Sequence, residues 1–148
     1  MQHLKISVVL CTYNGERYLR QQLDSLLSQT RIPDEIIAQD DGSTDHTIDI
    51  LQEYACRHPN FRILQNMGEH GVNPNFFSAL HQATGDLIAV CDQDDVWVAT
   101  KLERQEKAIG KNLLIGGRST PFSEDDNTPA SDDERLPNID LLRMMFVG

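Results

Sequence analysis

Short apolar segments alternate with helical patterns along the first 110 residues, and this alternation constrains the fold more than any other feature of the sequence. Four runs rich in β-branched and other apolar residues are predicted to be strands: residues 4–10, 35–39, 61–64 and 86–91. Between them, apolar side chains recur at helical spacing, as in the stripe of Leu19, Leu23, Leu26 and Leu27. This order predicts an α/β fold in which helices flank a mostly parallel, Rossmann-like sheet.

Proline positions set the expected helix boundaries. The first two helices are predicted to end before Pro33 and Pro59, because the residue before a proline is biased away from helical conformation. The third is predicted to begin at Pro74, since proline is tolerated in the first turn. A fourth helix is expected over residues 99–109, and a fifth strand over residues 112–117.

An acidic tetrad, Asp92-Gln93-Asp94-Asp95, follows the fourth predicted strand. Two carboxylates about 5 Å apart repel by roughly 3 kcal/mol at an effective dielectric of 20, so the cluster requires a cation, a captured proton or hydrogen bonds. Carboxylate oxygens without neighbouring thiolate or imidazole ligands suit Mg²⁺ or Mn²⁺, and Mg²⁺ commonly bridges to substrate phosphates. The alternative is an acidic loop whose carboxylates cap the following helix.

Polar clusters follow three of the four predicted strands, at residues 12–14, 40–41 and 92–95. In parallel α/β sheets, ligands bind beyond the carboxyl ends of the strands, so we expect the three clusters to meet there. Neither G-x-G-x-x-G nor G-x-x-x-x-G-K-[ST] occurs in the sequence, so no glycine-rich loop is predicted to hold phosphates. These observations favour a metal ion that clamps a diphosphate.

The net charge limits the classes of possible partner, and the cysteine content indicates the redox compartment. The chain has 148 residues, enough for one domain or part of one, and a net charge of −10, which disfavours nucleic acid or an anionic membrane as a direct partner. Its three cysteines form no C-x-x-C pair, which suits a reducing cytosol. No apolar run approaches the roughly 18 residues of a membrane span. We expect a cytoplasmic protein that reaches the inner face of the membrane, if at all, through partners.

The motifs resemble, in order and spacing, those of the family 2 glycosyltransferases of GT-A fold, from residue 6 to about residue 105. Five segments carry the resemblance: SVVLCTYNG at 7–15, LLSQT at 26–30, DDGSTD at 40–45, ATGD at 83–86 and DQDDVW at 92–97. The last is similar to the rhamnosyltransferase-like branch that elongates bacterial surface polysaccharides. The resemblance therefore implies a nucleotide-diphosphate sugar donor, dTDP-rhamnose or a UDP-sugar, and a saccharide or lipid-linked saccharide acceptor.

The resemblance also implies a set of site residues. Those expected to bind the nucleotide are Cys11, Thr12, Tyr13, Asn14, Asp41, Asn75, Asp92 and Asp94. Among them, Asp41 is expected to hydrogen-bond the pyrimidine base, whereas the neighbouring Asp40 is expected to be structural. Asp94 and Asp95 are expected to hold Mn²⁺ or Mg²⁺.

The family transfers sugars with inversion, which requires a carboxylate base to deprotonate the acceptor hydroxyl. That base lies downstream of the metal motif in the family, and here residues 119–135 form an acidic, Ser/Pro-rich stretch that is expected to be a mobile loop. We therefore expect residues 1–110 to be the donor-binding half and residues 111–148 a partial acceptor-side region, in a chain truncated before its catalytic base. The apolar segment at residues 139–148 is expected to favour self-association.

Two alternative functions remain open from the sequence. A chain that holds the donor half without the base could be a non-catalytic nucleotide-binding module. A nucleotidyltransferase of similar α/β build would show a glycine-rich, basic loop after the first strand, and residues 11–15 contain no basic residue.

Overall fold

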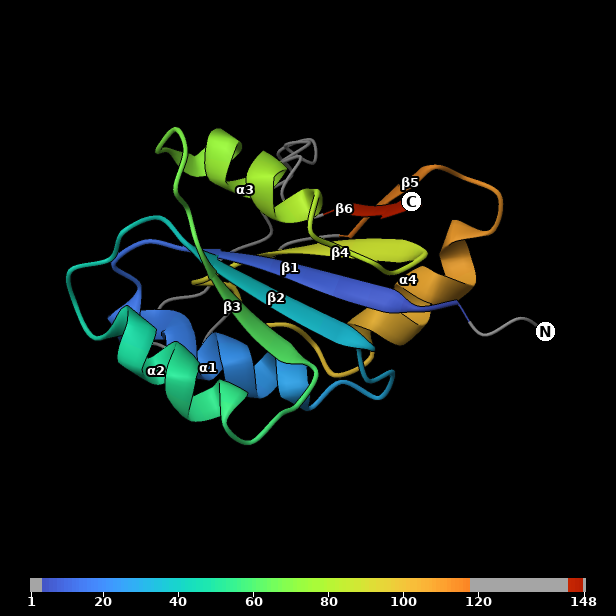
Figure 1. Ribbon diagram of the computed structural model, residues 1–148. Helices are drawn as coiled ribbons and strands as arrows, with labels where there is room; N and C mark the ends of the chain where they lie inside the picture. The colour runs from blue at the N-terminus through green and yellow to red at the C-terminus, as the bar shows by residue number, and fades with distance from the viewer. Residues whose placement is uncertain (1–3, 118–143, 148) are drawn as a thin grey trace, which may run out of the picture.

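The computed structural model describes residues 4–117 and 144–147 and consists of one sheet with helices on both faces (Figure 1). Its strand order is β3-β2-β1-β4-β6-β5. Four strands are parallel: β1 (Ile6–Thr12), β2 (Glu35–Asp40), β3 (Phe61–Gln65) and β4 (Leu87–Asp92). The antiparallel strand β6 (Met144–Val147) lies between β4 and the short β5 (Leu114–Gly116). The predicted α/β fold with a mostly parallel sheet is confirmed.

Helices cover the two faces of the sheet unequally. Three pack on one face, namely α1 (Glu16–Leu27), α2 (Thr47–Ala55) and α4 (Lys101–Ile109), while α3 (Val72–Leu80) lies alone on the other (Figure 1). The larger core cluster joins the leucine stripe of α1 to Val8 and Leu10 of β1, and the smaller one joins Phe76 of α3 to Val9. Every residue of β1 is buried because both of its faces are covered, which is why the run of residues 8–10 at its centre is apolar without alternation.

Strand β1 extends two residues beyond its predicted end. Cys11 continues the pairing on both sides, opposite Gln39 of β2 and Asp92 of β4, and Thr12 continues it opposite Asp40 of β2. This pairing outweighs the polar character that suggested a break at this point. The third helix begins at Val72, so that Pro74 occupies its first turn, where the missing N–H has no intrahelical partner to lose.

The C-terminal predictions are tested only in part. The predicted strand at residues 112–117 is found as β5, whereas the acidic stretch at residues 119–135 lies outside the described residues. Within the apolar segment at residues 139–148, residues 144–147 form β6 inside the sheet. The two-part division at residue 110 and self-association through the apolar segment stay predictions.

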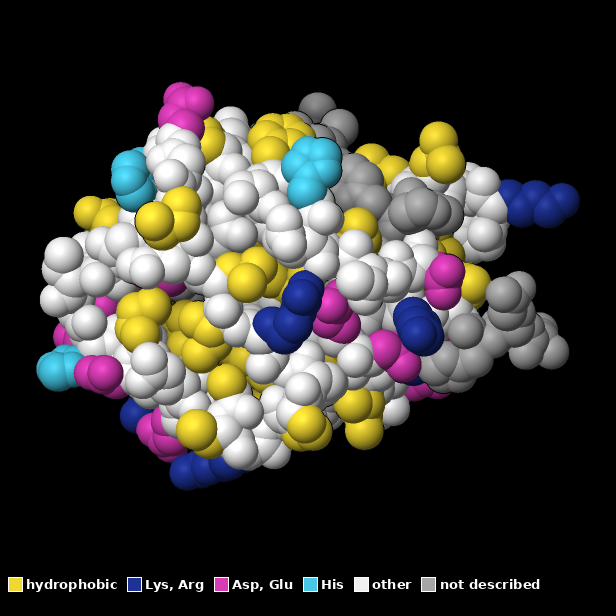
Figure 2. All heavy atoms as spheres, in the orientation of Figure 1, with side chains coloured by type: hydrophobic (Ala, Val, Ile, Leu, Met, Phe, Trp, Pro, Cys, Tyr) yellow, Lys and Arg dark blue, Asp and Glu magenta, His cyan; other side chains and the backbone are white. Residues whose placement is uncertain are grey.

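Surface charge on the face shown in Figure 2 is mixed. Lysine and arginine side chains are scattered over it, and several lie beside aspartate or glutamate. The described residues of this face therefore form no basic stripe of the kind that tracks a nucleic-acid backbone. Among the helices that the structure describes, none is long and apolar enough to cross a membrane.

Gly85 gives a stability prediction. A Cβ at this position would lie 2.7 Å from the backbone nitrogen and Oγ of Ser7 and 2.9 Å from the carbonyl oxygen of Lys5, so β1 would have to move. We expect Gly85→Ala to lower the free energy of unfolding by about 1–3 kcal/mol, the usual cost of overpacking. Urea unfolding measures this loss. Gly116→Ala is the matched control, because no atom of the described residues lies within 4 Å of its added Cβ, and equal unfolding midpoints for the two variants would contradict the prediction.

Candidate functional site

A cavity of about 840 Å³ opens at the carboxyl ends of the parallel strands. Seven of the eight residues predicted to bind the nucleotide line it: Cys11, Thr12, Tyr13, Asp41, Asn75, Asp92 and Asp94. Parallel pairing explains this convergence, because β1, β2 and β4 all end at the same edge of the sheet. The eighth, Asn14, is not among the lining residues. The carboxylate of Asp41 thus lies in one cavity with two carboxylates of the acidic tetrad.

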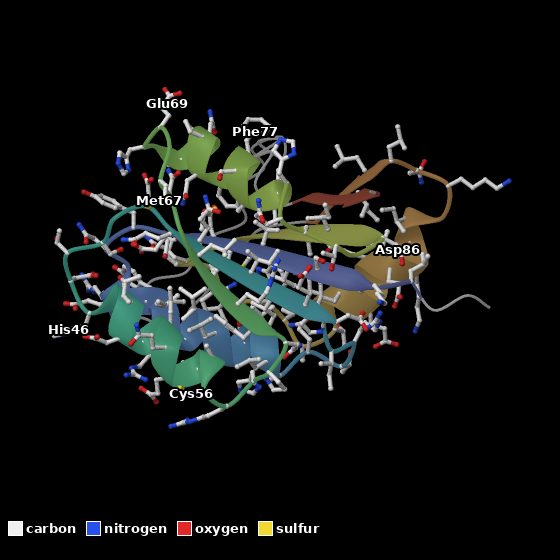
Figure 3. All side chains as sticks on the ribbon, viewed as in Figure 1. His46, Cys56, Met67, Glu69, Phe77 and Asp86 are labelled. Atoms are coloured by element: carbon white, nitrogen blue, oxygen red, sulfur yellow. The ribbon has the colours of Figure 1, made fainter. Side chains whose placement is uncertain are left out.

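Asp41 is held by the loop between β3 and α3. Its Oδ1 accepts hydrogen bonds from Nδ2 of Asn66 at 2.6 Å and contacts Nδ1 of His70 at 3.0 Å, and its Oδ2 accepts one from the backbone N–H of Gly71 at 2.8 Å. Figure 3 shows Met67 and Glu69 on this loop, at the end of the sheet opposite Asp86. A carboxylate has about four lone-pair sites, so these three contacts leave Asp41 acceptor capacity at the cavity.

The environment of Asp41 keeps its carboxyl group ionised. Burial by itself would raise the pKa of Asp41, but hydrogen bonds from Gly71, Asn66 and His70 hold the pKa below its ordinary value. An ionised carboxylate can accept hydrogen bonds but cannot donate them. Asp41 therefore presents a pure acceptor to the cavity at neutral pH, which suits an imide N–H such as N3–H of uracil or thymine.

Asp40 is not among the residues that line the cavity, and its side chain organises the turn after β2. Its side chain is fully buried and accepts four hydrogen bonds, from Thr12 Oγ1 at 2.8 Å, Ser43 Oγ at 2.5 Å, and the backbone N–H groups of Gly42 and Ser43 at 2.9 and 2.7 Å. These contacts join the end of β1 to the turn that carries Asp41. The structural role predicted for Asp40 matches this geometry.

Asn14 joins two loops instead of lining the cavity. It has a left-handed backbone conformation, with φ of 46°, and its Oδ1 accepts a hydrogen bond from the backbone N–H of Thr44 at 2.8 Å. The Oγ of Ser43 accepts from the N–H of Asn14, and the side chains of Thr47 and Asp45 accept from the next two backbone N–H groups. Side chains of the DDGSTD motif therefore accept hydrogen bonds from backbone N–H groups at the start of α1, which have no intrahelical acceptors.

Asn75 lies at the cavity, but its amide is engaged with β2. Its Nδ2 donates to the carbonyl oxygen of Gln39 at 3.1 Å, and its Oδ1 accepts from Nε2 of Gln39 at 3.0 Å. Both residues are buried. Asn75 thus fixes α3 against the sheet beside the cavity, and its expected contact with base or ribose stays a prediction.

The acidic tetrad forms the opposite side of the cavity from the loop at residues 66–71. Asp94 is exposed and Asp92 is partly buried, and both line the cavity, whereas Asp95 is not among the lining residues. Within residues 4–117, no three His, Cys, Asp or Glu side chains are grouped so that they could hold a metal ion by themselves. Mg²⁺ is usually bound by one or two carboxylates together with substrate phosphates and water, so this donor set fits such an ion when a diphosphate is present.

The segment after the tetrad is anchored by buried polar side chains of the first helical region. Ser25 Oγ accepts from the backbone N–H of Trp97 at 3.0 Å, and Gln29 bonds both the carbonyl oxygen of Val98 and the N–H of Leu102, at 2.9 and 3.1 Å. Trp97 itself is buried in the larger core cluster. These contacts fix the place where the acidic loop leaves the cavity, and they explain why Ser25 and Gln29 are polar although they are buried.

Cys11 supplies an apolar wall to the cavity. Burial raises the pKa of its thiol, and the nearby charges of Asp92 and Asp41 raise it further. Cys91, one position away in the paired strand, is also buried, and burial raises its pKa to about 12. Neither thiol is a thiolate at neutral pH, so neither is suited to act as a nucleophile or a metal ligand.

Sequence reasoning missed Gln93. Its side-chain amide lies between the acidic tetrad and the end of β1, where it exchanges two hydrogen bonds with the backbone of Tyr13. The sequence feature that could have drawn attention to Gln93 is that it is the one neutral residue among three carboxylates. Its partner lies 80 residues away in the sequence, so the contact could be found only from the structure.

Comparison with known proteins gives the following matches. The sequence profile described as glycosyl transferase family 2 matches residues 7–146. An uncharacterised glycosyltransferase of Nostoc sp. is 41% identical over 116 residues, which cover 76% of this chain and 35% of that protein. The UDP-Glc:α-D-GlcNAc-diphosphoundecaprenol β-1,3-glucosyltransferase WfgD of Escherichia coli is 32% identical over 114 residues, covering 77% of this chain and 44% of that protein. The chain spans about a third of the length of the curated relatives that it matches at 40–41% identity.

Two solved structures share the fold. Residues 1–349 of S. aureus TarS in complex with UDP-GlcNAc superpose with a TM-score of 0.67 at 30% identity, covering 81% of this chain and 38% of that chain. The mannosyltransferase PcManGT from Pyrobaculum calidifontis, in complex with GDP-Man and Mn²⁺, gives a TM-score of 0.70 and covers 78% of this chain and 35% of that chain. Its sequence identity of 23% supports the likeness in fold alone.

Proposed function

Since this chain belongs to glycosyl transferase family 2, we propose that its cavity binds the nucleoside diphosphate of a sugar donor, and that the protein transfers the sugar to a saccharide or lipid-linked saccharide acceptor in surface polysaccharide synthesis. One observation carries the proposal: the cavity has an ionised, pre-oriented acceptor, Asp41, and an acidic side that contains Asp92 and Asp94. The first suits a pyrimidine base, and the second suits a cation that neutralises a diphosphate.

Uracil or thymine is the base that we propose. Both present N3–H as a donor to Asp41, whereas N3 of cytosine is unprotonated and would place an acceptor against the acceptor oxygens of Asp41. Support comes from relatives that use uridine nucleotides, because the E. coli relative is named for UDP-Glc and the TarS structure contains UDP-GlcNAc. UDP-sugars and dTDP-rhamnose are therefore the proposed donors. The sequence of the acidic motif, DQDDVW at 92–97, favours the rhamnosyltransferase-like branch.

The proposed reaction is an inverting transfer. The acceptor hydroxyl attacks the anomeric carbon, a carboxylate base takes its proton, and the nucleoside diphosphate leaves with the electrons of the broken C–O bond. A bound Mn²⁺ or Mg²⁺ would stabilise the charge on the leaving diphosphate, with Asp94 and Asp95 as its proposed ligands. The base is proposed to lie outside the described residues. We propose a cytoplasmic location for the reaction.

Calorimetry with UDP, dTDP, GDP and CDP, each with and without Mn²⁺, tests the donor site. We expect UDP or dTDP to bind in a Mn²⁺-dependent manner, and we expect this dependence to be lost in Asp94→Ala and Asp95→Ala. Asp49→Ala is the matched control, because Asp49 lies on α2 and is exposed. Absence of binding by all four nucleotides to the native chain would refute the donor site. Turnover of a bound donor onto a defined acceptor would exclude the non-catalytic nucleotide-binding module.

A further inference from the structure

We propose that Gln93 is a positioning residue that locks the acidic loop to the end of β1, and so sets the geometry of the metal-binding side of the cavity relative to the nucleotide side. This inference rests on the proposed donor site. The backbone N–H of Tyr13 donates to Oε1 of Gln93 at 2.9 Å, and Nε2 of Gln93 donates to the carbonyl oxygen of Tyr13 at 3.0 Å. We call this reciprocal pair of hydrogen bonds the Gln93 clasp.

Only a carboxamide of this length can make both bonds. The side chain must accept from an N–H and donate to a C=O of the same residue, and an amide carries both functions whereas a carboxylate is acceptor-only. A glutamate at position 93 would lose the bond to the carbonyl oxygen of Tyr13. It would also add a fourth negative charge to Asp92, Asp94 and Asp95, which already repel one another. The neutral residue in the tetrad is therefore explained by its contact with Tyr13.

Gly15 provides the space for the clasp. A Cβ added there would lie 2.6 Å from Cδ of Gln93 and 3.3 Å from its Cγ, and the three nearest atoms to this Cβ all belong to Gln93. The backbone of Gly15, with φ of −103° and ψ of 11°, does not itself require glycine. Its N–H donates to Oγ1 of Thr47 at 2.8 Å, which fixes the loop against which Gln93 lies. Gly15 is therefore needed for the side chain of Gln93 and not for its own conformation.

The clasp joins the two sides of the cavity. Tyr13 lines the cavity from the end of β1, while Asp92 and Asp94 line it from the end of β4 and the following turn. The register of β1 with β4 ends where Cys11 lies opposite Asp92, and the clasp continues the connection between the two chain segments beyond that point. Loss of the clasp would let the acidic loop move relative to a bound nucleotide, and the loop would have to be ordered again on metal binding.

A double-mutant cycle tests the coupling between Gly15 and Gln93. We expect Gln93→Ala to weaken Mn²⁺-dependent binding of UDP by about tenfold, the combined effect of two ordinary hydrogen bonds. Gly15→Ala should have a similar effect, because its Cβ displaces the carboxamide. The double variant should bind no more weakly than either single variant, since both changes remove the same contact. If the two single-variant losses of UDP affinity multiply in the double variant, Gly15 and Gln93 act independently and the proposed coupling is wrong.

The readout separates positioning from general stability. Calorimetry is done for UDP with and without Mn²⁺ and for uridine, and urea unfolding is measured on the same variants. We expect the enhancement of UDP binding by Mn²⁺ to fall, while uridine binding and the unfolding midpoint stay close to those of the native chain. Gly116→Ala is the control for an added methyl group. The positioning role would be refuted if Mn²⁺ enhanced UDP binding in Gln93→Ala as much as in the native chain. It would also be refuted if a tenfold loss of UDP affinity were accompanied by a lowered unfolding midpoint.

A measurement without ligand distinguishes failure of this inference from failure of the proposed function. Amide hydrogen exchange at Tyr13 should be faster in Gln93→Ala and in Gly15→Ala than in the native chain, because its N–H loses its acceptor in both. Unchanged exchange at Tyr13 would refute the clasp itself. If the native chain fails to bind UDP, the donor site and the positioning role both fall. If UDP binds normally to all variants, only the positioning role falls.

Discussion

Asp40→Ala is expected to lower the free energy of unfolding by about 3–5 kcal/mol, because each buried donor that loses its acceptor costs about 1–3 kcal/mol and water can replace only part of the loss. The substitution removes the acceptor of four hydrogen bonds, donated by Thr12, Gly42 and Ser43. The turn that presents Asp41 should become disordered as a consequence. Urea unfolding measures the loss, and nucleotide binding should disappear with it.

Two further variants make the Asp40 prediction specific. Asp40→Asn keeps one acceptor oxygen but places an NH₂ group against backbone N–H donors, so its unfolding free energy should lie between those of the native chain and Asp40→Ala. Asp49→Ala removes an exposed carboxylate from α2 and should leave stability within about 0.5 kcal/mol of the native value. The prediction fails if Asp40→Ala unfolds at the same urea concentration as Asp49→Ala.

Asp41→Asn is expected to weaken binding of UDP by about 10- to 100-fold, the value of one hydrogen bond to a charged group. The native carboxylate offers only acceptors, whereas an asparagine offers one carbonyl oxygen and one NH₂ group. Its NH₂ group would oppose the donors of Gly71 or Asn66, and it could donate to N3 of cytosine. The preference for UDP over CDP should therefore shrink. Calorimetry with UDP and CDP on both chains checks this.

The pH dependence gives a second test of Asp41. Hydrogen bonds hold its folded-state pKa below the ordinary value of 3.8. The stability that the ionised carboxylate contributes is therefore present above about pH 3.8 and is lost as the pH falls through the lowered folded-state pKa. The difference in unfolding free energy between the native chain and Asp41→Asn should narrow as the pH falls from about 3.8 through the folded-state pKa of Asp41.

Asp49→Asn is the control for the nucleotide preference of Asp41→Asn, because it makes the same change in charge at an exposed position. It should preserve the ratio of UDP to CDP affinity. An equal loss of preference in Asp49→Asn would contradict the assignment of Asp41.

The location of the candidate cavity could be predicted from the sequence because it depends on the order of strands and helices along the chain and not on particular contacts. Apolar runs alternate with helical stripes, so the strands are parallel and end at one edge, and polar residues after those strands must meet there. The structure places Tyr13, Asp41 and Asp94 around one cavity as expected. The individual roles could not be predicted in the same way. Asn14 and Asp41 are both polar residues near strand ends, yet the side chain of Asn14 bonds to the loop at Thr44, away from the cavity.

The sequence by itself determined the α/β class, the positions of the four parallel strands to within two residues, and the family, since periodicity and motif spacing depend on residues close together in the chain. Only the tertiary structure decided which polar side chains are available to a ligand. Hydrogen bonds between distant segments engage Oδ1 of Asn14 and the amide of Asn75, and they place Asn66, His70 and Gly71 around Asp41. They also bind the side chain of Gln93 to the backbone of Tyr13, in the space left by Gly15. The physical reason is that a side-chain donor or acceptor has few bonding positions, and its partners are chosen by the packing of strands and loops that lie tens of residues apart.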